Sequence, residues 1–273
     1  MTVAIGVVSG EGIVIAADSR TTASPGGGPV RVLSDFTHKV FETGTSAVAT
    51  YGWAFLLDQN VASHVAALGA TDFGVSPSAV ATKLADVFGD IMARHIADGR
   101  DPEPATDVLG FLVGGYDDAS SPELYEALLP SGTVVPLISG GGSQGTGAAW
   151  RGQTDAIRRL IKGIDLDLLH SFALEDGHVS EMEALKGEIQ GLEYSIPFHL
   201  MNLQDAIDFA VFAIRTTIDA QRLSYGTLRR PGGAWPGVGG PIELATVRPG
   251  SGVQWIQKTM LQGARQPGDP ETA

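Results

Sequence analysis

The fold of this protein is decided by residues 2–18, which read TVAIGVVSGEGIVIAAD. Two short runs rich in Val and Ile, residues 3–8 and 13–17, flank the turn sequence Gly10-Glu11-Gly12. Branched side chains suit a pleated sheet, and glycine tolerates the positive φ angles of a tight turn. The pattern therefore predicts a β-hairpin that begins at the residue after Met1.

Thr2, the residue after Met1, is a candidate for chemistry. Removal of Met1 would leave a hydroxyl and a free α-amine on one residue, and such a pair can act as nucleophile and base. An α-amine has an ordinary pKa of about 7.7–8.0, so it can accept a proton near neutral pH. Any chain can begin with Met-Thr, so the interpretation depends on the residues around the hairpin.

Those residues are Ala16-Ala17-Asp18-Ser19-Arg20 at the end of the second run, and Lys39 after a glycine-rich loop. Together with Thr2 they resemble the N-terminal nucleophile hydrolases, specifically proteasome β-type subunits and their bacterial relatives. The resemblance covers residues 2–160 and 203–258. It implies a threonine hydrolase that cleaves a peptide or small amide through an acyl-enzyme and needs no cofactor. Thr2 would attack, Lys39 would ease loss of its proton, and Asp18 would hold Lys39 in place.

The resemblance implies further site residues. Gly52 would donate its backbone N–H to the developing oxyanion, and Thr50 would border the substrate pocket. Ser143, inside the glycine segment of residues 140–147, and Ser224, after the last long helical pattern, would support the nucleophile. Gln221 stands where the family places an aspartate.

The order of the predicted elements indicates an α+β fold. Runs of short strands alternate with runs of helices, which is typical of separate layers and not of βαβ units. The resemblance implies a four-layer αββα sandwich with two antiparallel sheets between helix layers. We expect one domain over residues 1–260, an acidic helical insertion at 164–202, and a disordered tail at 261–273. The expected strands are 3–8, 13–17, 30–33, 39–42, 46–51, 108–113, 123–128, 133–138, 242–247 and 253–257, and the expected helices are 53–68, 76–98, 148–162 and 204–221.

Composition narrows the classes of function. The 273 residues carry a formal charge of −13 and no cysteine. The negative charge argues against nucleic acid and anionic membranes as partners, and the lack of cysteine excludes disulfides, zinc–thiolate sites and a cysteine nucleophile. No apolar run approaches the ~18 residues of a membrane span, and the N-terminus lacks the positive region of a signal peptide. A cytoplasmic protein without a membrane or nucleic-acid partner is the expectation.

The glycine segment leaves two other interpretations open. Gly141-Gly142-Ser143-Gln144-Gly145 matches the nucleophile elbow of serine hydrolases, with Asp165 or Asp167 and several histidines further along the chain. The same segment matches the dinucleotide fingerprint, with Asp165 about twenty residues on. Both motifs require a parallel strand–turn–helix context, whereas this chain predicts antiparallel strands with short connections.

An oligomer is also expected. Proteasome-like subunits work in closed rings, and residues 53–68 and 80–92 carry apolar residues beyond one narrow helical stripe, among them Trp53, Val61 and Phe88. Such helices usually need a second partner surface. The main alternative to an enzyme is a catalytically silent β-like subunit that serves in assembly or binding. The sequence does not indicate the number of subunits or whether an ATPase partner is required.

Overall fold

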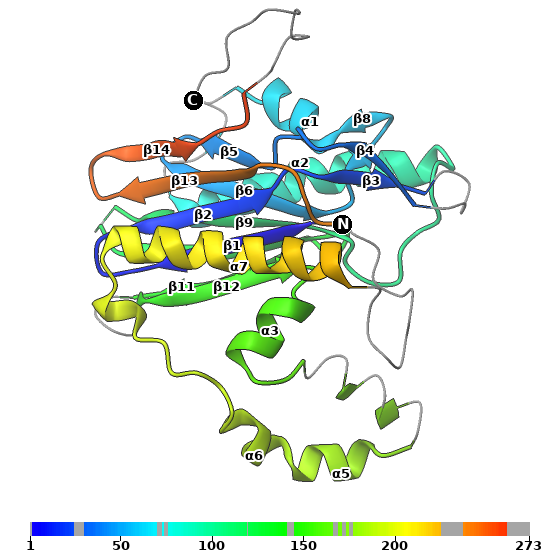
Figure 1. Ribbon diagram of the computed structural model, residues 1–273. Coiled ribbons are helices and arrows are strands. Elements are labelled where there is room, and N and C mark those ends of the chain that lie inside the picture. The colour runs from blue at the N-terminus through cyan, green and yellow to red at the C-terminus, as the bar shows by residue number, and fades with distance from the viewer. Residues whose placement is uncertain are drawn as a thin grey trace, which may run out of the picture.

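The structure is a computed structural model. It describes residues 2–24, 30–69, 73, 76–118, 120–140, 145–165, 169–170, 173–174, 177–224 and 237–260. The fold is mixed α and β, and its sheets are antiparallel, as the sequence predicts (Figure 1). Thr2 lies at the start of the first strand, so the hairpin of residues 2–18 is confirmed.

The first sheet is built around that hairpin. Its five strands are arranged in the order β12-β1-β2-β13-β14, and every neighbouring pair is antiparallel. The hairpin strands lie inside the sheet, with β12 and β14 at its edges. The bounds are β1 Val3–Val8, β2 Ile13–Asp18, β12 Gly147–Gly152, β13 Ile242–Arg248 and β14 Gly252–Gln257.

The second sheet also has five antiparallel strands, in the order β11-β10-β9-β6-β5. Its strands are β5 Val40–Thr43, β6 Ser46–Gly52, β9 Leu109–Tyr116, β10 Pro122–Leu129 and β11 Thr133–Ser139. Between the two sheets lies a closed apolar layer, in which Ile13 and Ile15 of β2 meet Leu112 of β9 and Leu124 of β10. The two sheets therefore bury one face of each against the other.

A long helix covers the outer face of each sheet. Helix α2, Pro77–Ala97, packs Leu84 and Phe88 against Phe111 of β9. Helix α7, Leu203–Leu223, packs Ala206 and Ala210 against β1 and β2, along which it runs in Figure 1. Both helices begin where the local sequence caps them: Ser76 accepts from Ala79 N before Pro77, and Asn202 forms a capping box with Asp205.

The helix expected at residues 53–68 is only partly right. Residues 53–60 instead form a small ribbon of β7 Phe55–Leu56 and β8 Gln59–Asn60, and α1 spans only Val61–Ala67. Leu57 and Asp58 have φ of 49° and 62°, a turn conformation that interrupts a helix. The side chains of Val61 and Phe88 are buried within this chain, so they give no support to a second partner surface.

The helix expected at residues 148–162 is wrong over its first half. Residues 147–152 form β12, paired antiparallel with β1, and only α3, Asp155–Ile161, is helical. A strand therefore follows the glycine segment where the nucleophile elbow and the dinucleotide fingerprint both require a helix. Ser143 itself lies outside the described residues. A further strand, β3 Thr21–Ala23, pairs with β4 Arg31–Ser34, in a stretch where a loop is expected before residue 30.

The segment between α3 and α7 projects away from the sheets in Figure 1. Its described parts include α5 Val179–Ala184, α6 Lys186–Gln190 and the short 3-10 helix η4 Phe198–Leu200. Leu185, Leu192, Tyr194 and Leu200 are all more than half exposed. In the part of the chain that the structure describes, no helix has the length and apolar character needed to cross a bilayer.

Candidate active site

Lys39 is a buried cation between the two sheets. Its side chain is 5% exposed, and Nζ donates to Asp18 Oδ1 at 3.0 Å and to the carbonyl oxygen of Arg20 at 2.6 Å. Burial lowers the pKa of the Lys39 ammonium, while the Asp18 carboxylate acts in the opposite direction. A lysine held in this way can assist proton transfer because its proton is bound less tightly than in water.

Asp18 holds the surrounding backbone as well as Lys39. Its carboxylate is fully buried and accepts from Val3 N (3.0 Å), Arg20 N (3.1 Å) and Gly239 N (3.0 Å). The start of β1 and the segments at Arg20 and Gly239 are thus all bonded to one side chain. Both oxygens of Asp18 are saturated, so it orients Lys39 and the start of β1 and is not free to serve as a base.

Thr2 lies beside this pair. It is 4% exposed, and it lines a small cavity together with Lys39, Thr50 and Gly52. Its carbonyl oxygen accepts from Gln153 N at 2.8 Å. Gly152 has φ of 83°, and a Cβ there would lie 1.9 Å from the Thr2 oxygen, so only glycine permits β12 to approach the N-terminal strand this closely.

Gly52 and Thr50 form another wall of the cavity, at the end of β6. Gly52 has φ of 92°, and an added Cβ would lie 2.0 Å from Val108 O, so the chain needs glycine here for its backbone alone. Thr50 N donates to Lys39 O at 2.9 Å. The structure thus brings together five of the sequence-predicted residues: Thr2, Asp18, Lys39, Thr50 and Gly52.

The remaining two predicted residues are Ser224 and Ser143. Ser224 is exposed at the C-terminal end of α7 and does not line this cavity. Ser143 lies outside the described residues. Gln221, in the family's aspartate position, is buried: its Nε2 donates to Gln153 Oε1 at 2.6 Å, and its Oε1 accepts from Val238 N at 3.0 Å. Gln221 thus connects Gln153, which bonds to Thr2 O, with Val238, whose neighbour Gly239 donates to Asp18.

Glu243 is a site residue that the sequence analysis missed. It lies on β13, is fully buried, and reaches the other sheet, where Oε2 accepts from Lys39 N at 2.8 Å and from Val40 N at 3.1 Å. Its Oε1 is bonded to His38 Nδ1 at 2.5 Å and accepts from Thr259 N at 3.4 Å. The backbone of Lys39 is therefore fixed by a second carboxylate. The sequence does hold one signal for this role, which is a charged residue inside the predicted strand 242–247.

A second buried polar cluster adjoins the cavity at Tyr51. The Tyr51 hydroxyl donates to Glu126, which also receives Arg151 Nε, and Arg151 Nη2 donates to Glu126 Oε2 at 2.8 Å. Burial, reinforced by the bond with Glu126, raises the pKa of Tyr51. The cluster joins β6 and β10 of one sheet to β12 of the other.

The described residues include no group of three or more His, Asp or Glu side chains placed to hold a metal ion. The groups that line the Thr2 cavity include the Thr2 hydroxyl, the buried Lys39 ammonium, the His38 imidazole and the backbone of Gly52.

Comparisons with known proteins identify solved structures with a similar fold. No protein-family model matches the chain, and no curated protein does. Solved structures do match. The helical assembly of the Anbu complex from Pseudomonas aeruginosa is 18% identical, with a TM-score of 0.54 over 90% of this chain and 81% of that chain. Anbu (ancestral beta-subunit) from Yersinia bercovieri is 16% identical, with a TM-score of 0.52 over 90% and 82%.

A Gly-1 mutant of Anbu from Hyphomicrobium sp. strain MC1 is 15% identical, with a TM-score of 0.51 over 91% and 82% of the two chains. At these identities the likeness concerns the fold alone. The assignment to proteasome β-type subunits of the N-terminal nucleophile hydrolases is therefore corrected. The chain has the fold of Anbu proteins, which are proteasome-like but form a distinct family.

Proposed function

We propose that the chain is a proteasome-like threonine hydrolase that cleaves peptide or small amide bonds. Thr2, once freed of Met1, attacks the carbonyl carbon through Oγ1, and its α-amine takes the hydroxyl proton. Attack gives a tetrahedral intermediate, whose C–N bond breaks as the α-ammonium of Thr2 passes the proton to the leaving amine. The acyl-enzyme that remains is hydrolysed by water, with the α-amine acting again as base. The N–H at Gly52 receives the oxyanion, and Thr50 borders the substrate side chain.

The observation that carries the proposal is the buried Lys39. Burying an ammonium is costly unless it is paired, and here Lys39 Nζ donates to Asp18 and to Arg20 O, while Glu243 accepts from the Lys39 backbone N. Packed at Thr2, a cation with a lowered pKa favours the neutral amine and the ionised hydroxyl, the two forms that the reaction needs. A catalytically silent subunit would be more stable with an apolar residue there, so this feature favours the enzyme over the silent alternative.

The test is a pair of variants at Thr2. Thr2→Ala and Thr2→Ser both keep a small residue after Met1, so both are equally suited to methionine removal, which intact mass measures. Activity is assayed on a panel of fluorogenic peptide amides, and an electrophilic peptide probe labels the N-terminal residue. We expect labelling and turnover in the wild type and in Thr2→Ser, and neither in Thr2→Ala. Cleavage by Thr2→Ala, or by protein that retains Met1, would contradict the proposal.

The proposal includes self-association. The Pseudomonas aeruginosa Anbu complex is described as a helical assembly. On this chain, the outward face of α7 leaves Phe212 47% and Leu223 73% exposed, next to Val211 and Ala220. We infer that this chain forms homo-oligomers, closed as rings or open as helices, because head-to-tail contacts give one or the other. Sedimentation velocity tests this, and a stable monomer with full activity would contradict it.

The same proposal covers the arrangement of layers. Helices α2 and α7 outside two packed sheets support a four-layer αββα sandwich, formed by residues 1–260 as one domain with an insertion at 164–202. Residues 261–273 lie outside the described residues. Limited proteolysis followed by mass analysis tests the domain, since we expect a single resistant core that lacks only parts of the insertion and residues 261–273.

A further inference from the structure

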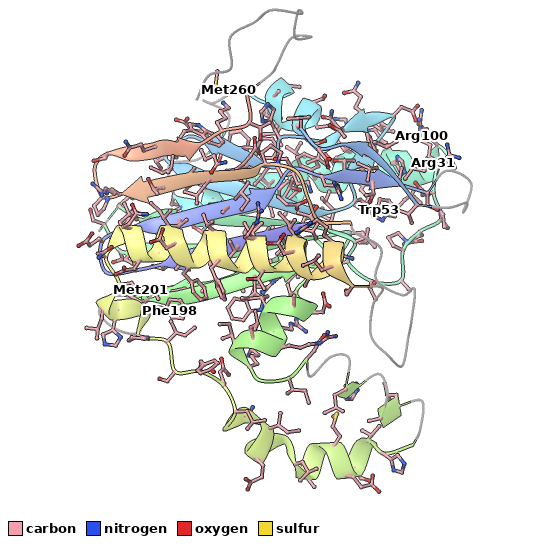
Figure 2. All side chains as sticks on the ribbon, viewed as in Figure 1. Arg31, Trp53, Arg100, Phe198, Met201 and Met260 are labelled. Atoms are coloured by element: carbon pink, nitrogen blue, oxygen red, sulfur yellow. The ribbon has the colours of Figure 1, made fainter. Side chains whose placement is uncertain are left out.

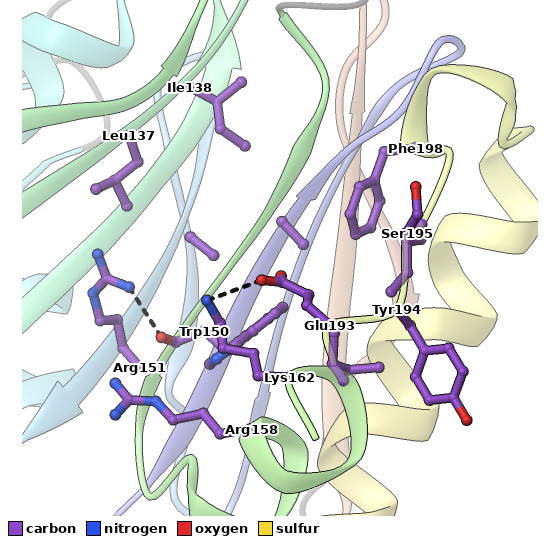
Figure 3. A pocket seen from close by; sticks show the side chains of 14 residues that line it. Leu137, Ile138, Trp150, Arg151, Arg158, Lys162, Glu193, Tyr194, Ser195 and Phe198 are labelled. Carbon is purple, nitrogen blue, oxygen red and sulfur yellow. Dashed lines mark hydrogen bonds and ion pairs between the residues drawn. The ribbon is translucent and has the colours of Figure 1, made fainter. Parts of the chain in front are cut away.

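A second cavity lies beyond the Tyr51–Glu126–Arg151 cluster, since Tyr51 lines the Thr2 cavity and Arg151 lines the second one. Its volume is ≈ 740 Å³, and it is enclosed by β11, β12, α3 and the connection from α6 to η4 (Figure 3). It shares no lining residue with the Thr2 cavity. Trp53, which lines the Thr2 cavity, and Phe198, which lines the second one, are well separated in Figure 2. The volume falls within the roughly 300–1,000 Å³ of small-molecule sites.

Three cations line this cavity, against one acid. Arg151 enters from β12, Arg158 and Lys162 come from α3 and its end, and Glu193 is the acidic residue of the wall. The whole chain carries a charge of −13, so this concentration of positive charge runs against the general field of the protein. A cavity lined in this way attracts a negatively charged ligand.

The three cations differ in how they are held, and Lys162 is the one with a long ion pair. Arg151 is fixed by Glu126 and by its bond from Nη1 to Trp150 O at 3.0 Å. By contrast, Lys162 Nζ stands 3.7 Å from Glu193 Oε2, an ion-pair distance beyond the range of a good hydrogen bond. Arg158 lines the cavity beside it and forms an ion pair with Asp165. An anionic oxygen can therefore bind Lys162 without displacing a hydrogen bond to Glu193.

Apart from Ser195, the rest of the wall is apolar and aromatic. Trp150 of β12, Phe198 of η4 and Leu137 of β11 line the cavity (Figure 3). A fully hydrated inorganic anion would leave these surfaces in contact with water, whereas a ligand with an apolar body would cover them. The site thus combines a charged end with an apolar end.

We propose that this cavity binds a small organic anion, with its carboxylate or phosphate at Arg158 and Lys162 and its apolar or aromatic body against Trp150 and Phe198. The proposal does not depend on the hydrolase activity. Lys162, whose ion pair with Glu193 is long, supplies affinity for the head group together with the charge of Arg158, and Arg151, held by Glu126, limits how deeply that group can enter.

The first experiment compares four probes on the full chain by calorimetry: phenyl phosphate, benzoate, inorganic phosphate and uncharged benzyl alcohol. We expect one or both aromatic anions to bind at least about tenfold more tightly than benzyl alcohol, the scale of one charge-assisted contact. The tighter of the two identifies the head group. Equal binding of benzyl alcohol would overturn the role of the cations, and equal binding of inorganic phosphate would overturn the role of the aromatic wall.

The second experiment locates the site with matched variants. Lys162→Gln and Arg158→Gln should each weaken binding of the better anion by about tenfold or more. Arg159→Gln is the control, because Arg159 lies on the same helix, pairs with Asp155 at 3.8 Å and does not line the cavity. It should change affinity by less than about twofold, as expected of an exposed charge. An equal loss in all three variants would show general charge attraction and overturn the site. Lys162 is at the end of α3, so its variant tests the proposal even if Arg158→Gln does not fold.

Discussion

Replacing Glu243 with alanine should destabilise the protein by several kcal/mol, and the structure sets the magnitude. Glu243 Oε2 accepts from Lys39 N at 2.8 Å and from Val40 N at 3.1 Å, and both of these residues are buried. Alanine leaves two buried N–H groups without an acceptor, at about 1–3 kcal/mol each, so the loss is roughly 2–6 kcal/mol. That is a large part of the 5–15 kcal/mol by which a typical domain is stable.

Glu243→Gln separates hydrogen bonding from charge. The amide oxygen can still accept from Lys39 N and Val40 N, while the amide nitrogen faces His38 Nδ1, which can change tautomer, and the distant Thr259 N at 3.4 Å. We expect a cost of only about 1 kcal/mol. Urea unfolding followed by circular dichroism gives both free energies. Glu243→Ala within about 1 kcal/mol of wild type, or Glu243→Gln as unstable as Glu243→Ala, would refute the reasoning.

Three further predictions concern the site. Lys39→Ala should lower the rate of amide cleavage by about 10²–10⁴ and leave the circular dichroism spectrum unchanged. Lys39→Arg should not restore the rate, because a guanidinium is not a point ammonium, and near-normal turnover of Lys39→Ala would remove Lys39 from the mechanism. Gly52→Ala should unfold at clearly lower urea than Gly132→Ala: both glycines have positive φ, at about 1–2 kcal/mol for an L-residue, but only at Gly52 would the new Cβ meet a backbone oxygen. The folded protein binds the Lys39 proton less tightly than the unfolded chain does. Between the lowered pKa and 10.5 the unfolded chain therefore holds more protons, and the free energy of unfolding rises with pH. Relative to Lys39→Met, the wild type should gain stability from neutral pH towards 10.5, and a difference that stays flat would contradict the lowered pKa.

Elements with strong local signals could be predicted from the sequence. The hairpin of β1 and β2 follows from its Val and Ile runs around two glycines, and α2 follows from Ser76, Pro77 and an apolar stripe. The stretch at 147–152 could not be predicted, since its small residues carry no strand pattern and its conformation is set by pairing with β1. The turn at Leu57 and Asp58 likewise depends on positive φ angles at residues that rarely adopt them.

The site residues also divide into those with a local sequence signal and those placed by distant contacts. Thr2, Asp18 and Lys39 belong to a linear motif that is readable along the chain, and the structure brings them together. Glu243 is 204 positions from Lys39, and Gln221 contacts Gln153 across 68 positions. Such contacts depend on how the two sheets face each other, which no local pattern records. A linear motif therefore finds the candidate reacting groups and their nearby partner Asp18, and misses distant residues such as Glu243 and Gln221.

The cluster of Tyr51, Glu126 and Arg151 has a consequence for the alignment of β12. This edge strand reads Gly-Ala-Ala-Trp-Arg-Gly, and small residues specify strand register weakly. Because side chains alternate between faces, a slip of one residue against β1 would turn Arg151 out of the layer between the sheets. Glu126 would then be a buried carboxylate without its cation, at a cost of about 3–5 kcal/mol. Arg151 thus disfavours the misaligned state more than it stabilises the aligned one, and it keeps the carbonyl of Thr2 opposite Gln153.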